Sequence, residues 1–353
     1  MGILHDCLYY FAIFIVLASL IPFIRHDYWI FRVFEYPRLQ KLTLNALILI
    51  LYLSFFPISS TGDYIIISIL AINLIYLCWL IAPFTVLSKK QLVQSSKPVG
   101  DRNIKLLIAN VFQDNRRAQD YHKLISKCNP DLILMVETNQ WWQDQMDPIA
   151  EDYPHQIKVP LENTYGMLLY SRMKLVEGSV QYLVEDDIPS IETFVKLASG
   201  EIIKLFCLHP RPPVPQENPQ STERDKEILL VAKKARECKY PTVVIGDLND
   251  VAWSYTTELF SKISKLLDPR KGRGFFNSFN AKYFFLRFPL DHVFCSADFS
   301  LTAIQRMNSC GSDHFPMHIN LQYDPKSVAD NDIPEADDDD IETYKEKVNA
   351  ETD

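Results

Sequence analysis

Three long apolar runs occupy most of the first ninety positions of the chain. Residues 8–24, 42–62 and 64–88 carry no charged side chain and are rich in Leu, Ile and Phe. A helix that crosses the hydrocarbon core of a bilayer needs about 20 mainly apolar residues, with a lower limit of roughly 17. The pattern therefore predicts a transmembrane module over residues 1–90 with about three helices, and a multi-pass integral membrane protein.

The first run is the shortest and allows other interpretations. An interfacial helix along the bilayer surface would also bury its apolar residues. A cleaved signal peptide is disfavoured, because residues 1–6 contain no Lys or Arg and no small-residue cleavage pattern follows the run. We expect three spans, with two spans plus an interfacial helix as the alternative.

Basic residues between the runs predict the orientation of the chain. The N-terminus and the short connection at residues 59–63 carry none. With three spans, the two basic segments lie on one side, which the positive-inside rule places in the cytoplasm together with the rest of the chain. The basic residues are Arg25, Arg32, Arg38 and Lys41 before the second run, and Lys89, Lys90 and Lys97 after the third.

Beyond a polar linker at residues 91–102, short apolar runs alternate with amphipathic segments. Residues 103–323 are enough for one large hydrophobic core. Helices mixed with a hairpin signal at Ser199-Gly200 predict an α+β fold with mixed or antiparallel sheets. Strands are expected at residues 104–112, 132–136, 167–170, 193–197, 202–208, 242–245, 290–295 and 315–321, and helices at 116–128, 222–238 and 255–266.

Charge separates a further segment from this domain. The whole chain has a net charge of −8, yet residues 324–353 alone carry −9. So polar a segment cannot offset the entropy lost on ordering, and we expect a disordered acidic tail there. Residues 103–323 carry −2, which offers no broad cationic surface for nucleic acid. Seven cysteines without a Cys-x-x-Cys pair indicate neither a zinc site nor a disulfide framework.

Polar side chains stand where the expected strands stop or start. If these strand ends converge, they form a cup of carboxylates, amides and histidines. Hard oxygen ligands suit Mg²⁺, or Mn²⁺ as the alternative, rather than zinc. The composition therefore predicts metal-assisted hydrolysis of a phosphoester. The residues are Asn110, Glu137, His209, Asp247, Asn249, Asp291, Asp313 and His314.

Six short motifs lie at the expected strand ends of this region. They are ANV at 109–111, PDLILMVE at 130–137, LH at 208–209, GDLND at 246–250, LDHVF at 290–294 and SDHFP at 312–316. In order and approximate spacing they resemble the endonuclease/exonuclease/phosphatase superfamily, which includes pancreatic deoxyribonuclease, apurinic endonucleases, inositol-polyphosphate 5-phosphatases and neutral sphingomyelinases. The resemblance covers roughly residues 103–322 and implies a four-layer αββα sandwich. The N-terminal spans resemble those of bacterial membrane-bound members.

The resemblance also implies roles for the acidic and amide residues. Glu137 would be the principal Mg²⁺ ligand, with Asn110 and Asp313 completing or supporting its shell. Asp247 would orient or deprotonate the attacking water. Asn249 would hold a phosphate oxygen or that water.

Two histidines would complete the site by the same resemblance. His314, oriented by Asp291, would contact the phosphate and act in acid–base chemistry. His209 would stabilise the pentacovalent state or protonate the leaving oxygen. Asp291 and His292 are neighbours on an expected strand and face opposite sides, so we assign Asp291 to the site and His292 to a structural position.

Two other segments are unusual for loops. The proline-rich segment, residues 210–215, follows His209 and is stiff, so it could shape a substrate entrance. The alternative is that residues 210–215 form an ordinary surface loop. Seven aromatic residues crowd positions 275–288, either as core packing or as an apolar lip that faces lipid.

Three functions fit this sequence. The favoured one is a membrane-anchored, Mg²⁺-dependent phosphoesterase, which hydrolyses a phosphodiester or phosphomonoester by in-line attack of an activated water. Its substrate would be lipid-linked or membrane-proximal, and the N-terminal helices would contact the lipid bilayer. A nuclease acting on nucleic acid is the alternative. A non-catalytic membrane scaffold is disfavoured, because every side chain that the chemistry needs is present.

Overall fold

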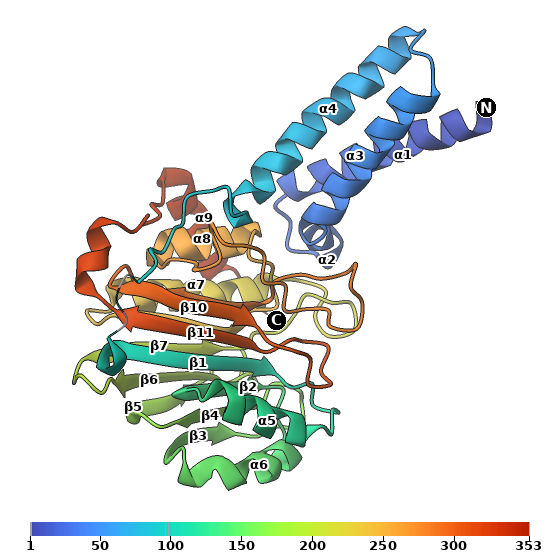
Figure 1. The fold of residues 1–353 in the computed structure, drawn as a ribbon. Coiled ribbons are helices and arrows are strands. Elements are labelled where there is room, and N and C mark those ends of the chain that lie inside the picture. Colours follow the sequence, from blue (N-terminus) through green and yellow to red (C-terminus); the bar gives the residue numbers. More distant parts are fainter. Residues whose placement is uncertain (1, 96, 98, 353) are drawn as a thin grey trace.

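The computed structural model describes residues 2–95, 97 and 99–352. In that part of the chain, two β-sheets pack face to face, with helices on both outer sides (Figure 1). Three long helices project together from one end of this sandwich. The arrangement confirms the predicted α+β sandwich preceded by an apolar helical module.

The six-stranded sheet has the order β10-β11-β1-β2-β4-β3. β1 and β2 are parallel, and all other neighbours are antiparallel. The strands are β1 (Asn103–Asn110), β2 (Leu132–Val136), β3 (His155–Val159), β4 (Met167–Ser171), β10 (Phe299–Arg306) and β11 (Met317–Tyr323).

The five-stranded sheet has the order β5-β6-β7-β8-β9, with β7 and β8 as its one parallel pair. The expected hairpin joins β6 to β7 at Ser199-Gly200, where Gly200 has a positive φ of 99° that favours glycine. The strands are β5 (Lys174–Gln181), β6 (Ser190–Lys196), β7 (Ile202–Leu208), β8 (Thr242–Asp247) and β9 (Asp291–Cys295).

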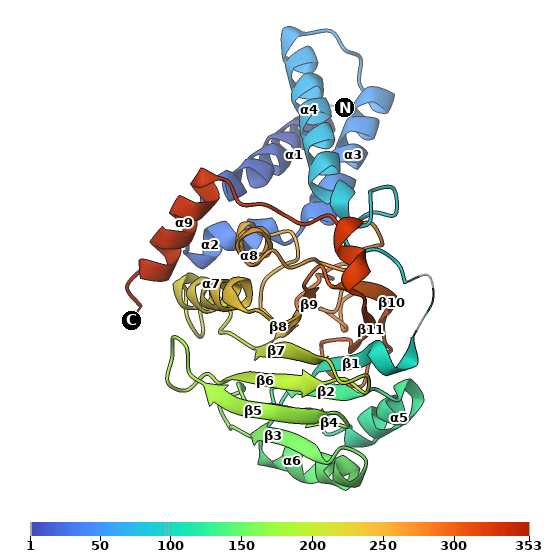
Figure 2. The same cartoon turned by 90° about the vertical axis from the view of Figure 1, so that its left-hand side faces the viewer.

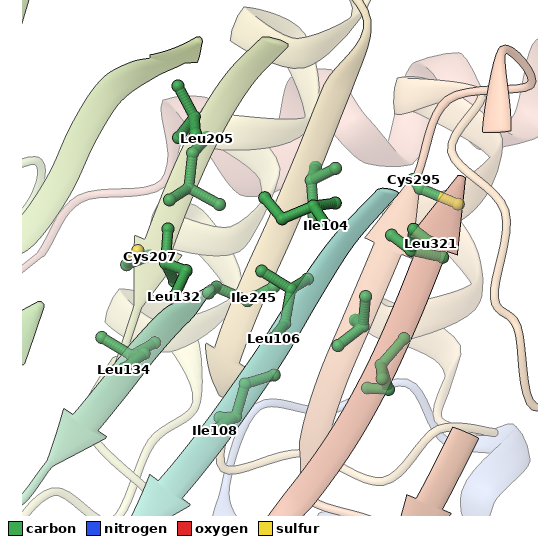
Figure 3. Packing of buried hydrophobic residues seen from close by; sticks show 14 of the residues in the cluster. Ile104, Leu106, Ile108, Leu132, Leu134, Leu205, Cys207, Ile245, Cys295 and Leu321 are labelled. Atoms are coloured by element: carbon green, nitrogen blue, oxygen red, sulfur yellow. The ribbon is translucent and has the colours of Figure 1, made fainter. Parts of the chain in front are cut away.

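Successive residues of the inner strands face different layers. In β1, Ile104, Leu106 and Ile108 lie between the two sheets, whereas Leu107 and Ala109 face the outer helices. This follows from the two-residue period of a strand. Figure 3 shows the core between the sheets, where β1, β2, β7 and β8 contribute alternate residues. Strands buried on both faces need nearly continuous apolar runs, which is why these four were predictable.

Two pairs of helices cover the outer faces. α5 (Ala118–Cys128) and α6 (Gln140–Met146) pack on the six-stranded sheet. α7 (Thr222–Glu237) and α8 (Tyr255–Ser264) pack on the five-stranded sheet (Figure 2). The three strands without a predicted counterpart, β3, β5 and β10, are all edge strands. Their more exposed positions lack a continuous apolar run.

Three helices are long and apolar enough to cross a membrane: α1 (Gly2–Leu20), α3 (Arg38–Phe55) and α4 (Thr61–Ile81). The candidate spans are Ile3–Phe23, Arg38–Phe55 and Thr61–Phe84, which begin five, four and three residues before the predicted 8–24, 42–62 and 64–88. Figure 1 places the α1–α3 connection and the end of α4 beside the sandwich, while the α3–α4 connection lies at the far end. Both basic segments therefore lie at the sandwich end of the helices.

Hydrogen bonds from two buried amides join α3 to α4. Asn73 Nδ2 donates to Asn45 Oδ1 at 2.9 Å, and Asn45 Nδ2 donates to the carbonyl of Leu70 at 2.9 Å. Apolar packing alone gives little preference for helix contact over lipid, so interhelical hydrogen bonds of this kind specify the arrangement.

The connector, residues 25–37 between α1 and α3, packs against the sandwich. It contains the short helix α2 (Trp29–Arg32). Arg32 Nη2 donates to Thr256 Oγ1 at 2.9 Å, and Trp253 Nε1 donates to the carbonyl of Glu35 at 2.9 Å. Phe84, at the end of the third span, lies against Trp253 with ring centroids 5.7 Å apart. The apolar helices are thus joined to the sandwich through a shared core.

The expected linker also contacts the sandwich. Leu301 N donates to the carbonyl of Val93 at 2.9 Å, and Ser95 N donates to the carbonyl of Leu301 at 2.8 Å. Leu92 is fully buried in the central core. Residues 96 and 98 of this segment lie outside the described residues.

The structure differs from the expected disordered tail. Helix α9 (Asp338–Asn349) packs along α7 and α8. Asp337 and Asp340 form a capping box, which uses two acidic side chains at the helix N-terminus. Lys347 Nζ lies 2.7 Å from Asp27 and 2.9 Å from Asp225. Composition alone missed this helix, because its order depends on caps and on ion pairs with distant segments.

Candidate active site

Polar side chains from both sheets meet at one edge of the sandwich. β1 and β2 end at this edge because they are parallel, as are β7 and β8. β9 and β11 start there, since each is antiparallel to a strand that ends there. The β8–β9 register sets Asp247 directly opposite Asp291. The topology therefore brings the predicted strand-end residues together.

Asn110 joins carboxylates from the two sheets. Its Nδ2 donates to Glu137 Oε1 at 2.6 Å and to Asp247 Oδ2 at 3.0 Å. Its Oδ1 accepts from the backbone N of Phe112 at 3.0 Å, which determines the orientation of the amide. Asn110 thus holds both carboxylates by direct contact.

His314 lies between two buried carboxylates. Its Nδ1 is 2.8 Å from Asp291 Oδ2, and its Nε2 is 3.5 Å from Asp247 Oδ2. Phe279 covers the imidazole at a centroid distance of 5.0 Å. Burial lowers the pKa of His314, but Asp291 and Asp247 outweigh this effect and raise the pKa to about 10. The ring is therefore an imidazolium at neutral pH.

Glu137 follows β2 in a left-handed backbone conformation, with φ at 58°. Burial raises the pKa of its carboxyl to about 7, although the hydrogen bond from Asn110 and the charge of His314 act in the opposite direction. Burial likewise raises the pKa of Asp247. Both neighbouring carboxyl groups are therefore hard to ionise, and a cation bound between them would favour their charged forms.

The turn after β8 positions Asn249. Its backbone N donates to Asp247 Oδ1 at 2.9 Å in an Asx turn, and its φ is 50°. Its Nδ2 donates to the carbonyl of Pro210 at 2.9 Å. Gly246 is required just before this turn, because a Cβ there would lie 1.9 Å from the carbonyl oxygen of Leu208.

His209 follows β7 and is buried, with a ring centroid 5.4 Å from that of Tyr165. Burial lowers the pKa of His209 to about 4. Its Nδ1 has no hydrogen-bond partner among the described residues. His209 is therefore a neutral imidazole with an unused ring nitrogen, in contrast to the charged His314.

Asp313 is placed differently from the other predicted residues. Its backbone carbonyl accepts from Ala281 N at 2.6 Å, and its side chain lies 3.4 Å from Ser312 Oγ. The compact acidic and histidine group in the described part of the chain consists of Asp247, Asp291 and His314, whose ligand atoms lie within 4.8 Å of one another. Three residues predicted for catalysis thus form a group that could also hold an ion, whereas Glu137 and Asp313, predicted as metal ligands, lie outside it.

Comparison with known proteins agrees with this geometry. The sequence model described as Endonuclease/Exonuclease/phosphatase family matches residues 107–314. This range contains the strand ends that build the site. The chain belongs to the endonuclease/exonuclease/phosphatase family. A comparison with curated proteins gave no match.

Solved structures of this family share the fold at low sequence identity. D. rerio TDP2, complexed with single-strand DNA product, is 17% identical with a TM-score of 0.52, covering 63% of this chain and 100% of that one. A family protein from Bacteroides thetaiotaomicron is 18% identical with a TM-score of 0.51, covering 65% and 99%. The three apolar helices lie outside the matched family range.

Enzymes of the endonuclease/exonuclease/phosphatase family hydrolyse phosphate esters and use divalent metal ions. The residues here fit such an ion. Carboxylate oxygens are hard donors that suit Mg²⁺. Asp291 Oδ1 is buried without a hydrogen-bond partner among the described residues, and the pKa values of Glu137 and Asp247 are raised by burial. A cation would relieve both conditions.

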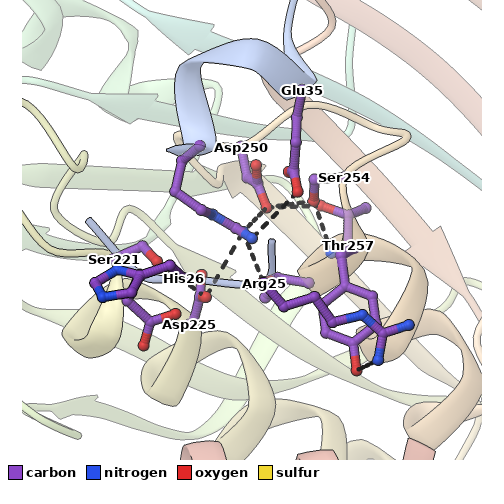
Figure 4. A network of polar contacts seen from close by, with 12 residues as sticks. Arg25, His26, Glu35, Ser221, Asp225, Asp250, Ser254 and Thr257 are labelled. Carbon is purple, nitrogen blue, oxygen red and sulfur yellow. Dashed lines mark hydrogen bonds and ion pairs between the residues drawn. The ribbon is translucent and has the colours of Figure 1, made fainter. Parts of the chain in front are cut away.

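Sequence reasoning missed the charged network behind the site. Arg224 and Asp225 form a buried pair 2.8 Å apart, and Arg32 lies 3.6 Å from Asp225 and 3.8 Å from Asp250. Asp250 accepts a hydrogen bond from Ser254, as Figure 4 shows. Since Asp250 follows Asn249, this network supports the turn after β8. In the sequence, Arg32 of the connector indicates only the orientation of the chain.

His292 occupies the structural position expected for it. Its Nδ1 lies 2.8 Å from Arg270 Nη2 and its Nε2 lies 2.8 Å from the carbonyl of Asp250. Burial, reinforced by Arg270, lowers the pKa of His292 to about 3. The neutral ring joins β9 to the turn after β8, on the side of the strand opposite to Asp291.

Proposed function

We propose that this chain is a membrane-anchored, metal-dependent phosphoesterase that hydrolyses a lipid-linked or membrane-proximal phosphate ester. The convergence of Asn110, Glu137, Asp247, Asp291 and His314 carries the proposal. These groups supply the hard ligands and the cation that stabilise a phosphoryl transition state. Family membership supports the reaction class.

The acidic residues would bind the ion and the water. Glu137 would hold Mg²⁺ or Mn²⁺, with Asn110 orienting its carboxylate. Such an ion neutralises charge on the phosphate oxygens. Asp247 would accept a proton from the attacking water. That water would approach the phosphorus on the side opposite the leaving oxygen. Asn249 would contact the phosphate or that water, and Asp313 would have a supporting role.

The two histidines would act in different protonation states. The pKa of His314, raised to about 10, favours an imidazolium that binds a phosphate oxygen. The pKa of His209, lowered to about 4, favours a hydrogen bond from a neutral ring to the reacting phosphate over proton transfer from a charged ring. This arrangement refines the leaving-group role that the family resemblance implied for His209.

The apolar helices support a substrate at the membrane. Tyr36 of the connector donates a hydrogen bond to the carbonyl of Asn249 at 2.9 Å, so the site turn is in direct contact with the segment between two candidate spans. A phosphate at the bilayer surface would then be near the catalytic residues.

A nucleic-acid substrate is the second candidate. It is favoured by the likeness to D. rerio TDP2, which was solved with single-strand DNA product. The net charge of −2 over residues 103–323 weighs against it, because nucleic-acid affinity depends on clustered Lys and Arg.

Purified full-length protein tests the proposal. With Mg²⁺ it should hydrolyse bis-p-nitrophenyl phosphate, and Glu137→Gln or Asp247→Asn should lower the rate by at least about 100-fold. Asp101→Asn, an exposed aspartate before β1, is the matched control and should retain activity. A panel of phospholipid, isoprenyl pyrophosphate, inositol phosphate and single-stranded DNA then separates the two substrate classes. Full activity in both site variants would contradict the proposal.

A further inference from the structure

An apolar groove of about 270 Å³ lies between the connector and the proline-rich segment. Trp29, Val33 and Tyr36 form one wall, and Pro212 through Gln216 form the other. Arg32 is the charged residue that lines it, but its terminal nitrogens are engaged with Glu35, Thr256 and the buried aspartates of the network. The groove therefore offers mainly apolar surface.

Backbone hydrogen bonds join the connector to the segment that directly follows the second wall. Trp29 N donates to the carbonyl of Pro219 at 2.7 Å, and Ser221 N donates to the carbonyl of Asp27 at 2.9 Å. Proline residues restrict φ throughout the second wall. Arg211, beside this wall, is paired with Glu185 at 3.1 Å, so it is not a free cation for the phosphate. The groove is preformed, which lowers the cost of binding a ligand there.

One end of the groove adjoins the catalytic turn. Tyr36, which lines the groove, donates to the carbonyl of Asn249, and Asn249 donates to the carbonyl of Pro210. Pro210 directly follows His209 and precedes the second wall. A molecule that placed its phosphate beside His209 could therefore extend an attached chain between the two walls.

The surroundings of the groove are continuous with the apolar helices. Ile30 and Val33 on the connector are each 45% exposed, although both are aliphatic. In the loop between Phe279 and Phe288, residues 283–286 expose three aromatic side chains and a leucine. Gln40 at the start of α3 donates to the carbonyl of Phe285 at 2.8 Å, which ties this loop to a candidate span. Exposed apolar surface of this extent beside membrane helices fits contact with lipid.

We propose that the groove binds the apolar chain of an amphiphilic phosphate ester whose phosphate lies in the catalytic cup. The occupant is a single extended hydrocarbon chain, because the lining is mainly apolar and one wall belongs to the connector between two candidate membrane spans. This inference rests on the proposed phosphoesterase activity and specifies its substrate class.

Two esters with the same leaving group test it. Full-length protein in phosphatidylcholine nanodiscs is assayed with methyl and dodecyl p-nitrophenyl phosphate, in the wild type and in Val214→Trp, which fills the groove. The dodecyl ester should show a rise in KM of about tenfold in the variant, since several buried methylenes lose their contacts, while the methyl ester is unaffected. Val328→Trp, the same change at an exposed valine away from the groove, should change neither.

A second measurement needs no turnover. Dodecyl phosphate carrying a terminal diazirine is photolysed with the wild-type protein, and labelled peptides are mapped. Labels on residues 29–36 and 212–216 support the groove, even if every hydrolysis assay fails and the proposed function falls. Hydrolysis with unchanged chain-length preference in Val214→Trp, or labels confined to the spans, would overturn the groove while leaving the phosphoesterase proposal intact. If Val214→Trp does not fold, the labelled positions decide.

Discussion

Burial among charges determines the state of each residue in the site. Asp247 is fully buried and touches Asn110, while His314 lies 3.5 Å away. The same environment raises the pKa of His314 and lowers that of His209. Two histidines that look equivalent in the sequence therefore differ in charge, because only His314 has a carboxylate on each side.

This difference predicts a pH dependence of stability. The pKa of His314 rises from 6.5 to about 10 on folding. The protonated ring therefore stabilises the folded state fully below about pH 6.5, and this contribution to the free energy of unfolding is lost as the pH rises through about 10. Thermal unfolding of the protein in EDTA should show a midpoint that falls over this range. Asp291→Asn should make that fall shallower, because the main charge that raises the pKa is gone. An unchanged slope in the variant would contradict the assignment.

Tyr36 is predicted to position the catalytic turn. Its hydroxyl and Arg224 both donate to the carbonyl of Asn249, at 2.9 Å and 2.8 Å. Tyr36→Phe removes one hydrogen bond worth about 1 kcal/mol, so kcat should fall several-fold while KM for methyl p-nitrophenyl phosphate stays constant. Tyr28→Phe, in the same connector, is the control. A change in KM alone would assign Tyr36 to substrate binding instead.

At the scale of elements, the strands that could be predicted are those with an uninterrupted run of apolar residues. β2 and β7 match their expected ranges at residues 132–136 and 202–208, because both are buried on both faces. Three of the four edge strands, β3, β5 and β10, and the short α6 lacked a predicted counterpart, since partial exposure gives a mixed pattern. The aromatic stretch at 275–288 divides into two groups. Phe279 and Phe288 pack inward, whereas Tyr283, Phe284 and Phe285 are exposed.

Helix α9 is predicted to stabilise the whole assembly through one lysine. Lys347 bridges Asp27 of the connector and Asp225 of α7. Lys347→Met leaves both carboxylates without this cation, which should cost about 3 kcal/mol for a largely buried pair. The thermal midpoint in detergent should fall accordingly. Lys345→Met, at an exposed position on the same helix, should leave it unchanged, and equal midpoints for both variants would exclude the bridge as a source of stability.

At the scale of the whole molecule, the apolar helices and the sandwich form one connected structure. Phe84 and Tyr36 pack with Val251, Trp253 and Phe288 in one cluster behind the site. The substrate class inferred above depends on this union, because the groove needs one wall from the connector and one from the sandwich.

The orientation of the chain gives a further prediction. Both basic segments lie at the sandwich end of the helices, so the positive-inside rule places the C-terminus in the cytoplasm. An epitope tag at the C-terminus should resist protease added to intact cells, and a tag inserted between Ser59 and Ser60 should be cleaved. The reverse result would mean that the sandwich faces outward.

The sequence by itself determined the layers of this protein and the residue types at its site. The length and periodicity of the apolar runs revealed the apolar helices and the buried strands, and the order of the motifs revealed the family. Only the tertiary structure decided which residues share an environment. It made His314 charged and His209 neutral, left Asp313 at the margin, ordered the acidic tail and joined Arg32 to Asp250. Such pairings depend on contacts between segments far apart in the chain, which no local pattern records.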